Sequence, residues 1–547
     1  MRILVADKLA EEGLEFLKQS GAAFDVKVGL KEDELAAAVP AYDALIVRSG
    51  AKVTAKVLAN PGQLKAIARA GVGVDNIDLR ASTEKGILVL NTAEASTLST
   101  AEHALALMMS LARKVPAANV ALKSGQLDGP AWKNRTAFQG TQLAGKTLGV
   151  VGLGRIGRTV ASRALALEMN VIGFDPYYTQ PTALDGRVLM VRDFDEFLKQ
   201  IDVITFHVPG GEGTRHLLNR ERLFNVAKPN LLVVNDARGE VVDEFALAEA
   251  IKEKRIAGAA LDVFIKEPPA KDHPLFGLDN VVLTPHLGAS TDEAQTAVSV
   301  EACKAIVAYL KSGEIRGAVN AGGIKLDLPP EELAFAKLAQ RIGALLAGFH
   351  EGGYKTITLR ASGPRAPKHM NTLLRLAAVE MLRAHLTDPV NVINVEHLAK
   401  SRGIDLVAIA ENSPPQGLVG DVIGVRVDAP SGSGGESNRI LGTVYADNLP
   451  RILRVDNFNM DMVPEGQMVM IVNKDQPGVI GVVGSSFGDA QVNIADMVIS
   501  RDQRPDGAIA LMVLKTDQAA PDALLNRQRA RPGILRVKPV TLPARDQ

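Results

Sequence analysis

The stretch 146–175 constrains the fold of this chain more than any other segment. An apolar strand at 148–151 leads into a glycine-rich turn, and the turn opens a helix whose apolar residues recur with helical spacing. The turn carries three glycines in the pattern Gly-x-Gly-x-x-Gly: Gly152, Gly154 and Gly157. A second short strand, 171–174, ends on Asp175. A strand, a turn, a helix and an acid about 20 residues further on are together typical of a dinucleotide-binding unit.

Each part of this unit has a physical role in holding a dinucleotide. The first glycine permits the tight turn, the second lets a pyrophosphate approach the backbone, and the third lets helix and strand pack closely. The helix N-terminus offers free N–H groups and a positive dipole to the phosphates. Asp175 can accept two hydrogen bonds from the adenosine ribose and would repel a 2′-phosphate, and residues 176–179 contain no Arg that would bind one. We therefore expect NAD rather than NADP, the alternative being a glycine-rich turn of another α/β sheet.

Composition narrows the class of protein. At 547 residues the chain is too long for one hydrophobic core, so three or more domains are expected. Hydrophobic residues at 46% and charged residues at 23% are ordinary for a soluble globular protein. Lys plus Arg number 62, as do Asp plus Glu, so no basic field favours nucleic acid or an anionic membrane. The single Cys303 excludes an intramolecular disulfide, indicates the cytoplasm, and has the helical spacing of a buried apolar residue.

The sequence shows no targeting, membrane or metal-binding signal. The chain starts with a strand at 3–6 rather than a basic and apolar leader, so no signal peptide is expected. No run approaches about 20 apolar residues without charges, so no membrane span is expected. None of the 9 histidines has metal-ligand spacing to a second His or Cys, so no metal is predicted.

Strand and helix patterns alternate through the first half of the chain, which predicts α/β architecture. Five strands are expected first: 3–6, 24–28, 44–47, 64–69 and 87–90. After a long helix at 99–113, the cofactor unit is expected to continue through four further strands: 203–206, 231–235, 258–261 and 281–284. A second long helix, 290–311, closes this half. We predict two doubly wound parallel-sheet lobes, a Rossmann-type cofactor lobe at 99–286 inserted in a flavodoxin-like substrate lobe at 1–98 and 287–316.

Two smaller α+β domains are expected in the second half. The first, at 317–462, has helical and strand patterns in these places: 333–349, 356–359, 370–386, 421–427, 440–445 and 451–457. The second, at 463–547, starts with a strand at 469–472 and the loop Asn-Lys-Asp-Gln-Pro-Gly. A helix at 479–487, three strands and a short final helix follow, the strands being 492–494, 497–501 and 508–514. This order predicts a ferredoxin-like βαββαβ fold.

Three charged or titratable residues follow strands of the cofactor lobe: Arg238, Glu267 and His286. Open α/β sheets bind ligands at this carboxyl edge. Reversible alcohol oxidation beside a nicotinamide requires such groups. His286 would take the hydroxyl proton, Glu267 would hold the other imidazole nitrogen and stabilise the charged ring, and Arg238 would grip a carboxylate and polarise the carbonyl. Taken singly, each would more often be a solvated or structural residue, but together they predict a dehydrogenase site.

Six motifs make the chain similar to the D-2-hydroxyacid dehydrogenase family, in its long form with a C-terminal ACT domain. They are 70–78, 152–157, 235–239, 262–268, 285–291 and 473–478. The similarity covers nearly the whole chain and is less specific between about 320 and 450. The resemblance implies that Arg238, Glu267 and His286 are the catalytic set. It also implies oxidation of 3-phospho-D-glycerate to 3-phosphooxypyruvate with NAD, at the start of L-serine synthesis.

The resemblance assigns cofactor contacts to the glycine turn, to Asp175 and to the ends of the later strands. These positions are Gly152, Gly154, Arg155, Ile156, Gly157, Asp175, Val208, Asp236, Ala237, Arg238, Asp262, His286, Gly288 and Ala289. The family often has Cys where this chain has Asp236. Because that position contacts the cofactor through its backbone, we expect the departure to change little.

A phosphorylated substrate requires a cationic site. Arg48 and Arg69 each stand at the end of a predicted first-lobe strand and face the presumed cleft. The resemblance assigns substrate binding to this region, including Ser49 and Gly71. Cations here suit a short hydroxy acid with a carboxylate at one end and a phosphate at the other. A surface residue such as Arg48 is otherwise a solubilising charge.

The resemblance also implies partners. The polar segment 132–135 should reach the neighbouring subunit's cleft, which indicates a homo-oligomer, either a dimer or a tetramer, although Trp132 could equally fill an interface. The ACT domain implies feedback by L-serine, bound at Asn473, Asp475 and Asn493. The Asn and Asp of the first loop could instead cap the helix expected from 479.

Two other functions stay open on the sequence. One is another D-2-hydroxyacid dehydrogenase, of the hydroxypyruvate, glyoxylate, glycerate or lactate type. The two substrate-lobe arginines and the ACT domain argue against it. The other is an NAD-sensing scaffold on the same fold that binds NAD and a partner without turnover. The intact Arg, Glu and His set argues against that function.

Overall fold

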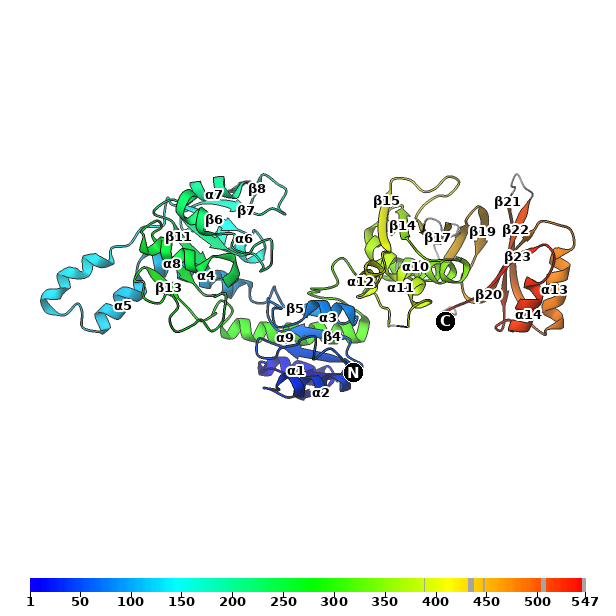
Figure 1. The fold of residues 1–547 in the computed structure, drawn as a ribbon, viewed down its shortest axis with the longest axis horizontal. Helices are drawn as coiled ribbons and strands as arrows, with labels where there is room; N and C mark the ends of the chain where they lie inside the picture. Colours follow the sequence, from blue (N-terminus) through cyan, green and yellow to red (C-terminus); the bar gives the residue numbers. More distant parts are fainter. Residues whose placement is uncertain (388, 431–436, 446–447, 503–507, 544–547) are drawn as a thin grey trace.

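The computed structural model describes residues 1–387, 389–430, 437–445, 448–502 and 508–543. Four β-sheets, of five, eight, six and four strands, organise these residues. Figure 1 shows an extended molecule in which the first sheet and helix α9 (Asp292–Ser312) lie between the second sheet on one side and the last two sheets on the other.

The first sheet is wholly parallel and has the order β2-β1-β3-β4-β5. Its strands are β1 (Arg2–Val5), β2 (Ala23–Val26), β3 (Ala44–Val47), β4 (Ala66–Arg69) and β5 (Leu88–Asn91). Helices α1 (Glu11–Gln19) and α9 share one core with the sheet, and α2 (Glu32–Ala38) and α3 (Leu79–Glu84) cover the other face. Burial on both faces explains why the central strands are continuous apolar runs. This strand order is that of flavodoxin-like folds, so the predicted flavodoxin-like lobe is confirmed.

The second sheet has the order β13-β12-β11-β10-β6-β7-β9-β8. Its strands are β6 (Thr147–Val151), β7 (Asn170–Phe174), β8 (Thr182–Ala183), β9 (Val188–Met190), β10 (Val203–Phe206), β11 (Leu232–Asn235), β12 (Gly258–Leu261) and β13 (Val281–Leu283). Helices α4 (Thr97–Ala112) and α6 (Arg155–Ala166) pack on one face, and α7 (Phe194–Gln200) and α8 (Glu244–Lys252) on the other. The strand order reverses between β6 and β10, and open α/β sheets bind ligands beyond the carboxyl ends of the strands at such a point. The predicted Rossmann-type fold is confirmed.

Between α4 and β6 the chain forms an arm that consists of α5 (Val115–Lys123) and a 3-10 stretch, Gly129–Phe138. Figure 1 shows α5 projecting away from the second sheet. Four large apolar side chains of the arm are exposed: Val115, Val120, Leu122 and Trp132. Within the described ranges, no single helix is long and apolar enough to cross a membrane, and α4 with α5 meets that standard only as a pair bent by 63°.

The third sheet is mixed and has the order β15-β14-β16-β17-β18-β19. Its strands are β14 (Thr356–Ser362), β15 (Asp405–Glu411), β16 (Val422–Asp428), β17 (Asn438–Val444), β18 (Pro450–Val455) and β19 (Phe458–Met462). Helices α10 (Pro330–Phe349), α11 (Met370–Arg383) and α12 (Val395–Ser401) pack with it. Strands β15 and β19 and helix α12 are additions to the elements that the sequence predicts.

The fourth sheet is antiparallel and has the order β21-β22-β20-β23. Its elements are β20 (Gly466–Lys474), α13 (Val479–Asp489), β21 (Ile494–Asp502), β22 (Ile509–Thr516), α14 (Asp522–Arg529) and β23 (Ile534–Leu542). The predicted βαββαβ order is confirmed. The prediction of separate strands at 492–494 and 497–501 is wrong, because β21 is one strand. Its register shifts between Ile494 and Asp496, and such a bulge interrupts the alternation that marks a strand in sequence.

The sheets are joined through apolar contacts. Met468 and Val540 of the fourth sheet belong to the same core as α10, so the last two sheets pack as one body. Ile393, which precedes α12, is buried in the core of the first sheet. Beside it, Asn391 Nδ2 donates a hydrogen bond to the Gly86 carbonyl over 2.9 Å. The C-terminal half therefore touches the first sheet directly.

Candidate active site

The glycine turn lies at the switch point between β6 and β10 and has little room for side chains. Gly152 has a φ of 88°, and a Cβ there would lie 2.7 Å from the His207 carbonyl oxygen. A Cβ on Gly157 would lie 1.9 Å from the Gly152 oxygen, so helix α6 needs a glycine to approach the strand. Nothing lies within 4 Å of a Cβ placed on Gly154. Two glycines shape the turn and the third leaves an open face at the N-terminus of α6, which is a cradle that fits a pyrophosphate.

Asp175 lies beside this cradle, at the end of β7. Its Oδ2 accepts the Leu153 N–H over 3.0 Å, and its Oδ1 accepts the Tyr177 N–H over 2.9 Å. The two bonds fix the carboxylate next to the glycine turn, as a ribose-binding acid requires. Arg155, the first residue of α6, is exposed and pairs with Glu94. The neighbouring predicted positions Ile156 and Val208 are partly buried, with Val208 against Gly152.

His286 and Glu267 form a hydrogen-bonded pair. His286 Nδ1 lies 2.9 Å from Glu267 Oε2, and Glu267 Oε1 accepts the Phe264 N–H over 3.1 Å. The carboxylate is thus fixed at one oxygen and orients the imidazole with the other. Because the pair uses Nδ1, the Nε2 atom is the one that faces away from Glu267. Both side chains are solvent-accessible, at 52% for His286 and 39% for Glu267, so a substrate can reach them.

Asp262 holds the loop that carries the predicted catalytic histidine. Its side chain is fully buried, and it accepts the N–H groups of Leu287 over 2.7 Å and of Gly288 over 2.8 Å. Its Oδ1 also lies 3.2 Å from His103 Nε2 on α4. Burial raises the pKa of Asp262, but the hydrogen bonds from His103 and the loop outweigh burial and leave it lowered. A carboxylate with a lowered pKa therefore fixes the backbone directly after His286. The carbonyl oxygen of Ala289, the next predicted position, accepts a hydrogen bond from the side-chain amide of Gln295.

Arg238 reaches from the second sheet to the first. Its Nε lies 3.2 Å from Asp75 Oδ2, and a Cβ on Gly73 would lie 2.0 Å from its Nη2. Its Nη1 donates to the Ala237 carbonyl over 2.6 Å. Ala237 itself is buried. The guanidinium therefore lies against the 73–75 loop, where the two sheets face each other.

Arg48 and Arg69, on the first sheet, add two cations near the Arg238 guanidinium. Burial, and after it the charges of Arg238 and Arg48, lower the pKa of Arg69 to about 10, while Asp75 opposes this shift. In the described part of the chain Arg69 Nε is buried without a hydrogen-bond partner. Arg48 donates to Gln295 on α9. The predicted substrate-site arginines are thus brought together with Arg238, and an anion would compensate their mutual repulsion.

Two smaller residues predicted for substrate binding, Gly71 and Ser49, lie beside these arginines. A Cβ on Gly71, which has a φ of 145°, would lie 1.5 Å from Arg69 Nη1, so only glycine leaves room for that side chain. Ser49 is exposed directly after Arg48. Both positions therefore border the arginine cluster, which we define as Arg48, Arg69 and Arg238.

The loops after β11 and β12 are packed tightly together. A Cβ on Gly239 would lie 2.0 Å from the Phe264 carbonyl carbon. Phe264 is also the residue whose N–H holds Glu267. Arg238 and Glu267 therefore sit on loops in direct contact, and the Asp262 carbonyl links the second loop to His286 through a bond of 2.8 Å. The three predicted catalytic residues belong to one connected edge of the second sheet.

Some residues at this edge, or facing it, are missed by reasoning from the sequence. His207 follows β10 at the same carboxyl edge, which is a usable signal. Asp75 carries no such signal, because its role depends on two sheets meeting. His103 lies within an apolar helix, and only the fold brings it to Asp262. Asp236 is predicted through its backbone alone, whereas its carboxyl is buried beside His207, at 3.5 Å between Oδ1 and Nδ1.

The predicted serine positions do not form one site within a single chain. Asn473 is buried near one end of the fourth sheet, where it pairs with Ala510, and Asp475 beside it pairs with Arg501. Asn493 is exposed near the other end and bonds Asp517 over 2.7 Å. The strand length between these ends is about 20 Å. The alternative that the loop residues cap α13 is wrong, because that helix begins after Gly478 without a side-chain cap.

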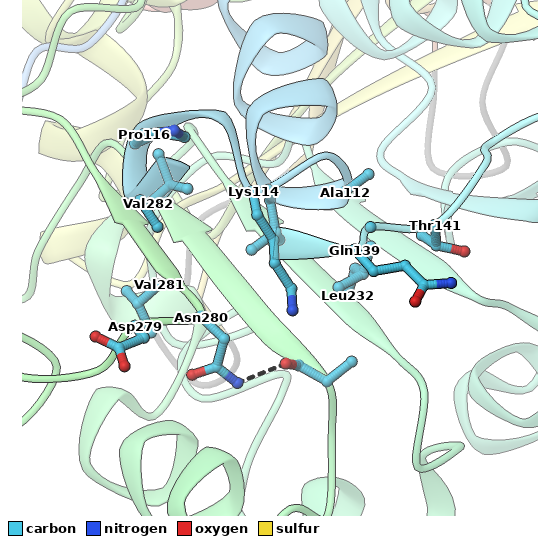
Figure 2. A pocket seen from close by; sticks show the side chains of 14 residues that line it. Ala112, Lys114, Pro116, Gln139, Thr141, Leu232, Asp279, Asn280, Val281 and Val282 are labelled. Carbon is cyan, nitrogen blue, oxygen red and sulfur yellow. Dashed lines mark hydrogen bonds between the residues drawn. The ribbon is translucent and has the colours of Figure 1, made fainter. Parts of the chain in front are cut away.

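A separate cavity of about 270 Å³ lies at the base of the arm (Figure 2). It is bordered by Leu232 and Val281, the first residues of β11 and β13, and by Lys114 and Gln139, which flank the arm. The candidate active site lies beyond the last residues of these strands. The cavity is thus at the opposite end of the sheet and takes no part in the site. Among described residues, no group of three His, Cys, Asp or Glu could hold a metal ion.

Comparison with known proteins agrees with this geometry. Residues 105–288 match the family of D-isomer specific 2-hydroxyacid dehydrogenases in its NAD binding domain. The chain is therefore an NAD-binding member of that class of dehydrogenases. Residues 333–456 match the D-3-phosphoglycerate dehydrogenase intervening domain, and residues 468–533 match the ACT domain.

Similarity to individual proteins extends over nearly the whole chain. The D-3-phosphoglycerate dehydrogenase of Archaeoglobus fulgidus is 39% identical over 98% of this chain and 99% of its own length. That of Bacillus subtilis is 37% identical over 99% of this chain and its full length. The chain belongs to the D-3-phosphoglycerate dehydrogenase family. A crystal structure of a glyoxylate reductase from Paecilomyes thermophila, 29% identical, has a TM-score of 0.53 and covers 58% of this chain and 98% of that one.

Proposed function

We propose that this chain oxidises 3-phospho-D-glycerate to 3-phosphooxypyruvate with NAD, the entry to L-serine synthesis. The observation that carries the proposal is that Arg238 shares an edge of the second sheet with the His286–Glu267 pair and faces Arg69 and Arg48 of the first sheet. A doubly charged short hydroxy acid requires cations at both ends and a proton acceptor between them. Family membership over nearly the full length supports the same reaction.

The proposed mechanism follows from the fixed groups of the site. When bound, the cofactor supplies a nicotinamide that accepts a hydride from the substrate carbon. His286 takes the hydroxyl proton at Nε2, the nitrogen that faces away from Glu267. Glu267, held by the Phe264 N–H, compensates the positive charge that the ring acquires. Arg238 binds the substrate carboxylate with its planar fork and polarises the forming carbonyl.

The substrate phosphate is assigned to Arg48 and Arg69. Arg69 keeps its charge near neutral pH, because its lowered pKa of about 10 still lies well above that range. Its buried Nε would gain a hydrogen-bond acceptor from a bound anion. Arg48 lies at the end of the neighbouring strand, β3, and can release Gln295 to reach a phosphate. Ser49 and Gly71 complete this proposed subsite.

Removal of Arg48 tests the phosphate assignment. We expect Arg48→Ala to lower kcat/KM for 3-phospho-D-glycerate about 10-fold or more, as the loss of a hydrogen bond to a charged group does. Activity on unphosphorylated D-glycerate should hardly change. Initial rates of NADH formation with both substrates measure the difference, and Arg80→Ala, which removes an exposed cation of the same domain, is the control. Equal losses on both substrates would show that Arg48 does not contact the phosphate.

We also propose the domain division stated from the sequence: a substrate domain at 1–98 and 287–316, a cofactor domain at 99–286, an intervening domain at 317–462 and an ACT domain at 463–547. Packing of α9 in the core of the first sheet supports the discontinuous first domain. Limited proteolysis tests the division. Cleavage that separates 1–98 from 287–316 while each part stays folded would contradict it.

A homo-oligomer, dimer or tetramer, is part of the proposal. The arm's exposed Val120, Leu122 and Trp132 form an apolar surface that a second copy would bury. Light scattering on the purified chain checks the oligomeric state, and a monomer at micromolar concentration would rule out this part. The proposed location is the cytoplasm, where the buried, unpaired Cys303 would stay reduced. Cell fractionation that finds the chain outside the cytoplasm would contradict it.

Feedback by L-serine is proposed for the ACT domain. Because Asn493 lies far from Asn473 and Asp475, one serine can contact all three only if two ACT domains pair. Asn473 Oδ1 is buried without a partner in the described structure, so it is available to a ligand amine. Calorimetric titration with L-serine tests the site on the oligomer. Absence of binding, together with unchanged activity at millimolar serine, would remove the proposal.

A further inference from the structure

The carboxyl of Asp236 occupies an unusual place for an acid. Its side chain is fully buried directly after β11, and neither oxygen has a hydrogen-bond partner in the described part of the chain. A buried carboxylate without partners costs several kcal/mol, roughly, whereas the protonated acid costs far less. An acid at this position therefore requires either a compensating cation or a proton.

The neighbours of Asp236 provide no full compensating charge. His207, on the β10 side, is buried, and burial lowers its pKa to about 3, so its imidazole is neutral. Its Nε2 lies 3.1 Å from Thr205 Oγ1, which leaves Nδ1 toward Asp236 Oδ1. Asp262, on the β12 side, is ionised and repels a second negative charge. His103, from α4, interacts mainly with Asp262, with 3.2 Å between His103 Nε2 and Asp262 Oδ1.

The balance of these groups favours the neutral acid. Burial, and after it the charge of Asp262, raise the pKa of Asp236, and with the opposing effect of His103 it comes to about 8. A protonated Asp236 can donate its O–H to His207 Nδ1, a contact of 3.5 Å that a small rotation shortens. If Asp236 lost that proton, its carboxylate would repel the nearby carboxylate of Asp262, as happens in other pairs of acids.

The position of this acid relates it to the cofactor. Asp175 and the glycine turn would hold the adenosine half on the β6–β7 side, so the nicotinamide half would lie over β10, β11 and β12. His207, Asp236 and Asp262 follow these three strands in turn. A Cβ on Gly152 would lie 2.7 Å from the His207 carbonyl oxygen, so this cluster adjoins the cradle.

We propose that Asp236 is a positioning residue that remains protonated near neutral pH and bonded to His207, and that its ionisation at higher pH tightens binding of NAD⁺ relative to NADH. The sign follows from charge: the oxidised nicotinamide ring is positive and the reduced ring is neutral, so a nearby carboxylate stabilises only the oxidised form. This inference rests on the proposed cofactor site but not on the identity of the substrate.

Infrared spectroscopy of the protein without cofactor tests the protonation state first. We expect the C=O stretch of a protonated carboxylic acid near neutral pH, lost as pH rises through about 8. The band should be absent in Asp236→Asn and present in Asp279→Asn, which removes an exposed carboxylate at the opposite end of the same sheet. A wild-type spectrum without the band near neutral pH would overturn the proposal, whatever the variants do.

Cofactor binding then tests the consequence. Fluorescence titrations should show the ratio of the NADH to the NAD⁺ dissociation constant rise about fivefold between roughly pH 7 and 9. The measurement uses the His286→Gln background, so that titration of the catalytic imidazole does not contribute. Asp236→Asn keeps a donor toward His207 without ionising, and its ratio should stay flat, while Asp279→Asn should follow the parent. A rise that persists in Asp236→Asn would overturn the assignment, and loss of all cofactor binding at every pH would instead contradict the proposed function.

Discussion

His286→Ala is expected to lower kcat by about 10²–10⁴, the contribution of a positioned general base. His286 has the geometry of such a base, because its Nδ1 is bound to Glu267 at 2.9 Å and its ring is accessible. The cofactor cradle lies on other residues, so the dissociation constant of NAD⁺ should change little. Initial rates and fluorescence titration of NAD⁺ measure the two effects.

Glu267 provides the control for this prediction. Glu267→Gln keeps an oxygen that can accept the Phe264 N–H but removes the charge beside the imidazole, so it should lower kcat less than His286→Ala does. The two changes act on one unit, so the double variant should be no slower than His286→Ala alone by more than a few-fold, roughly. Near-normal turnover in His286→Ala, or strictly additive losses in the double variant, would show that the pair does not transfer the proton.

Arg238→Lys is expected to lower kcat/KM by about 10- to 100-fold. Lysine keeps the charge but not the planar pair of donors that matches a carboxylate, so one hydrogen bond to a charged group, about 1.5–3 kcal/mol, is lost. The guanidinium also repels Arg69 in the free enzyme, and a bound substrate anion would relieve that repulsion. Steady-state kinetics with 3-phospho-D-glycerate and with D-glycerate check the result.

The loss should be similar for both substrates, because both carry the carboxylate that Arg238 binds. This pattern separates Arg238 from Arg48, whose removal should matter only when a phosphate is present. Asp75→Asn is the matched control: it frees Arg238 from its ion pair at 3.2 Å without removing a donor, and should change kcat/KM by less than about threefold. An Arg238→Lys enzyme with wild-type kcat/KM would place the carboxylate elsewhere.

Local patterns are sufficient to predict most of the fold. The three glycines predict the strand–turn–helix at β6 and α6. Two of them lie where a Cβ would clash, and the third leaves the N-terminus of the helix open. Apolar runs predict the strands of the two parallel sheets because burial on both faces removes alternation. The single strand β21 is missed as a unit because its bulge breaks the alternation on which strand prediction rests.

The candidate site is predictable wherever a residue follows a strand. Arg238, Glu267 and His286 each do so, and parallel strands place their carboxyl ends at one edge. Contacts between distant segments are not predictable: Asp75 meets Arg238 because the two domains face each other, and Gln295 meets Arg48 because α9 packs on the first sheet. The burial of the Asp236 carboxyl depends on neighbours from three other elements. For the same reason, sequence cannot show that Asn493 lies far from Asn473 within one chain.

The most direct test of the central claim is the substrate preference of the purified full-length chain. NADH formation is measured with NAD⁺ and a panel of 2-hydroxy acids: 3-phospho-D-glycerate, D-glycerate, D-lactate and glycolate. The arginine cluster predicts turnover with the phosphorylated acid and a kcat/KM for it at least about 10-fold above the others. Equal or faster oxidation of an unphosphorylated acid, or no NADH with any of them, would contradict it.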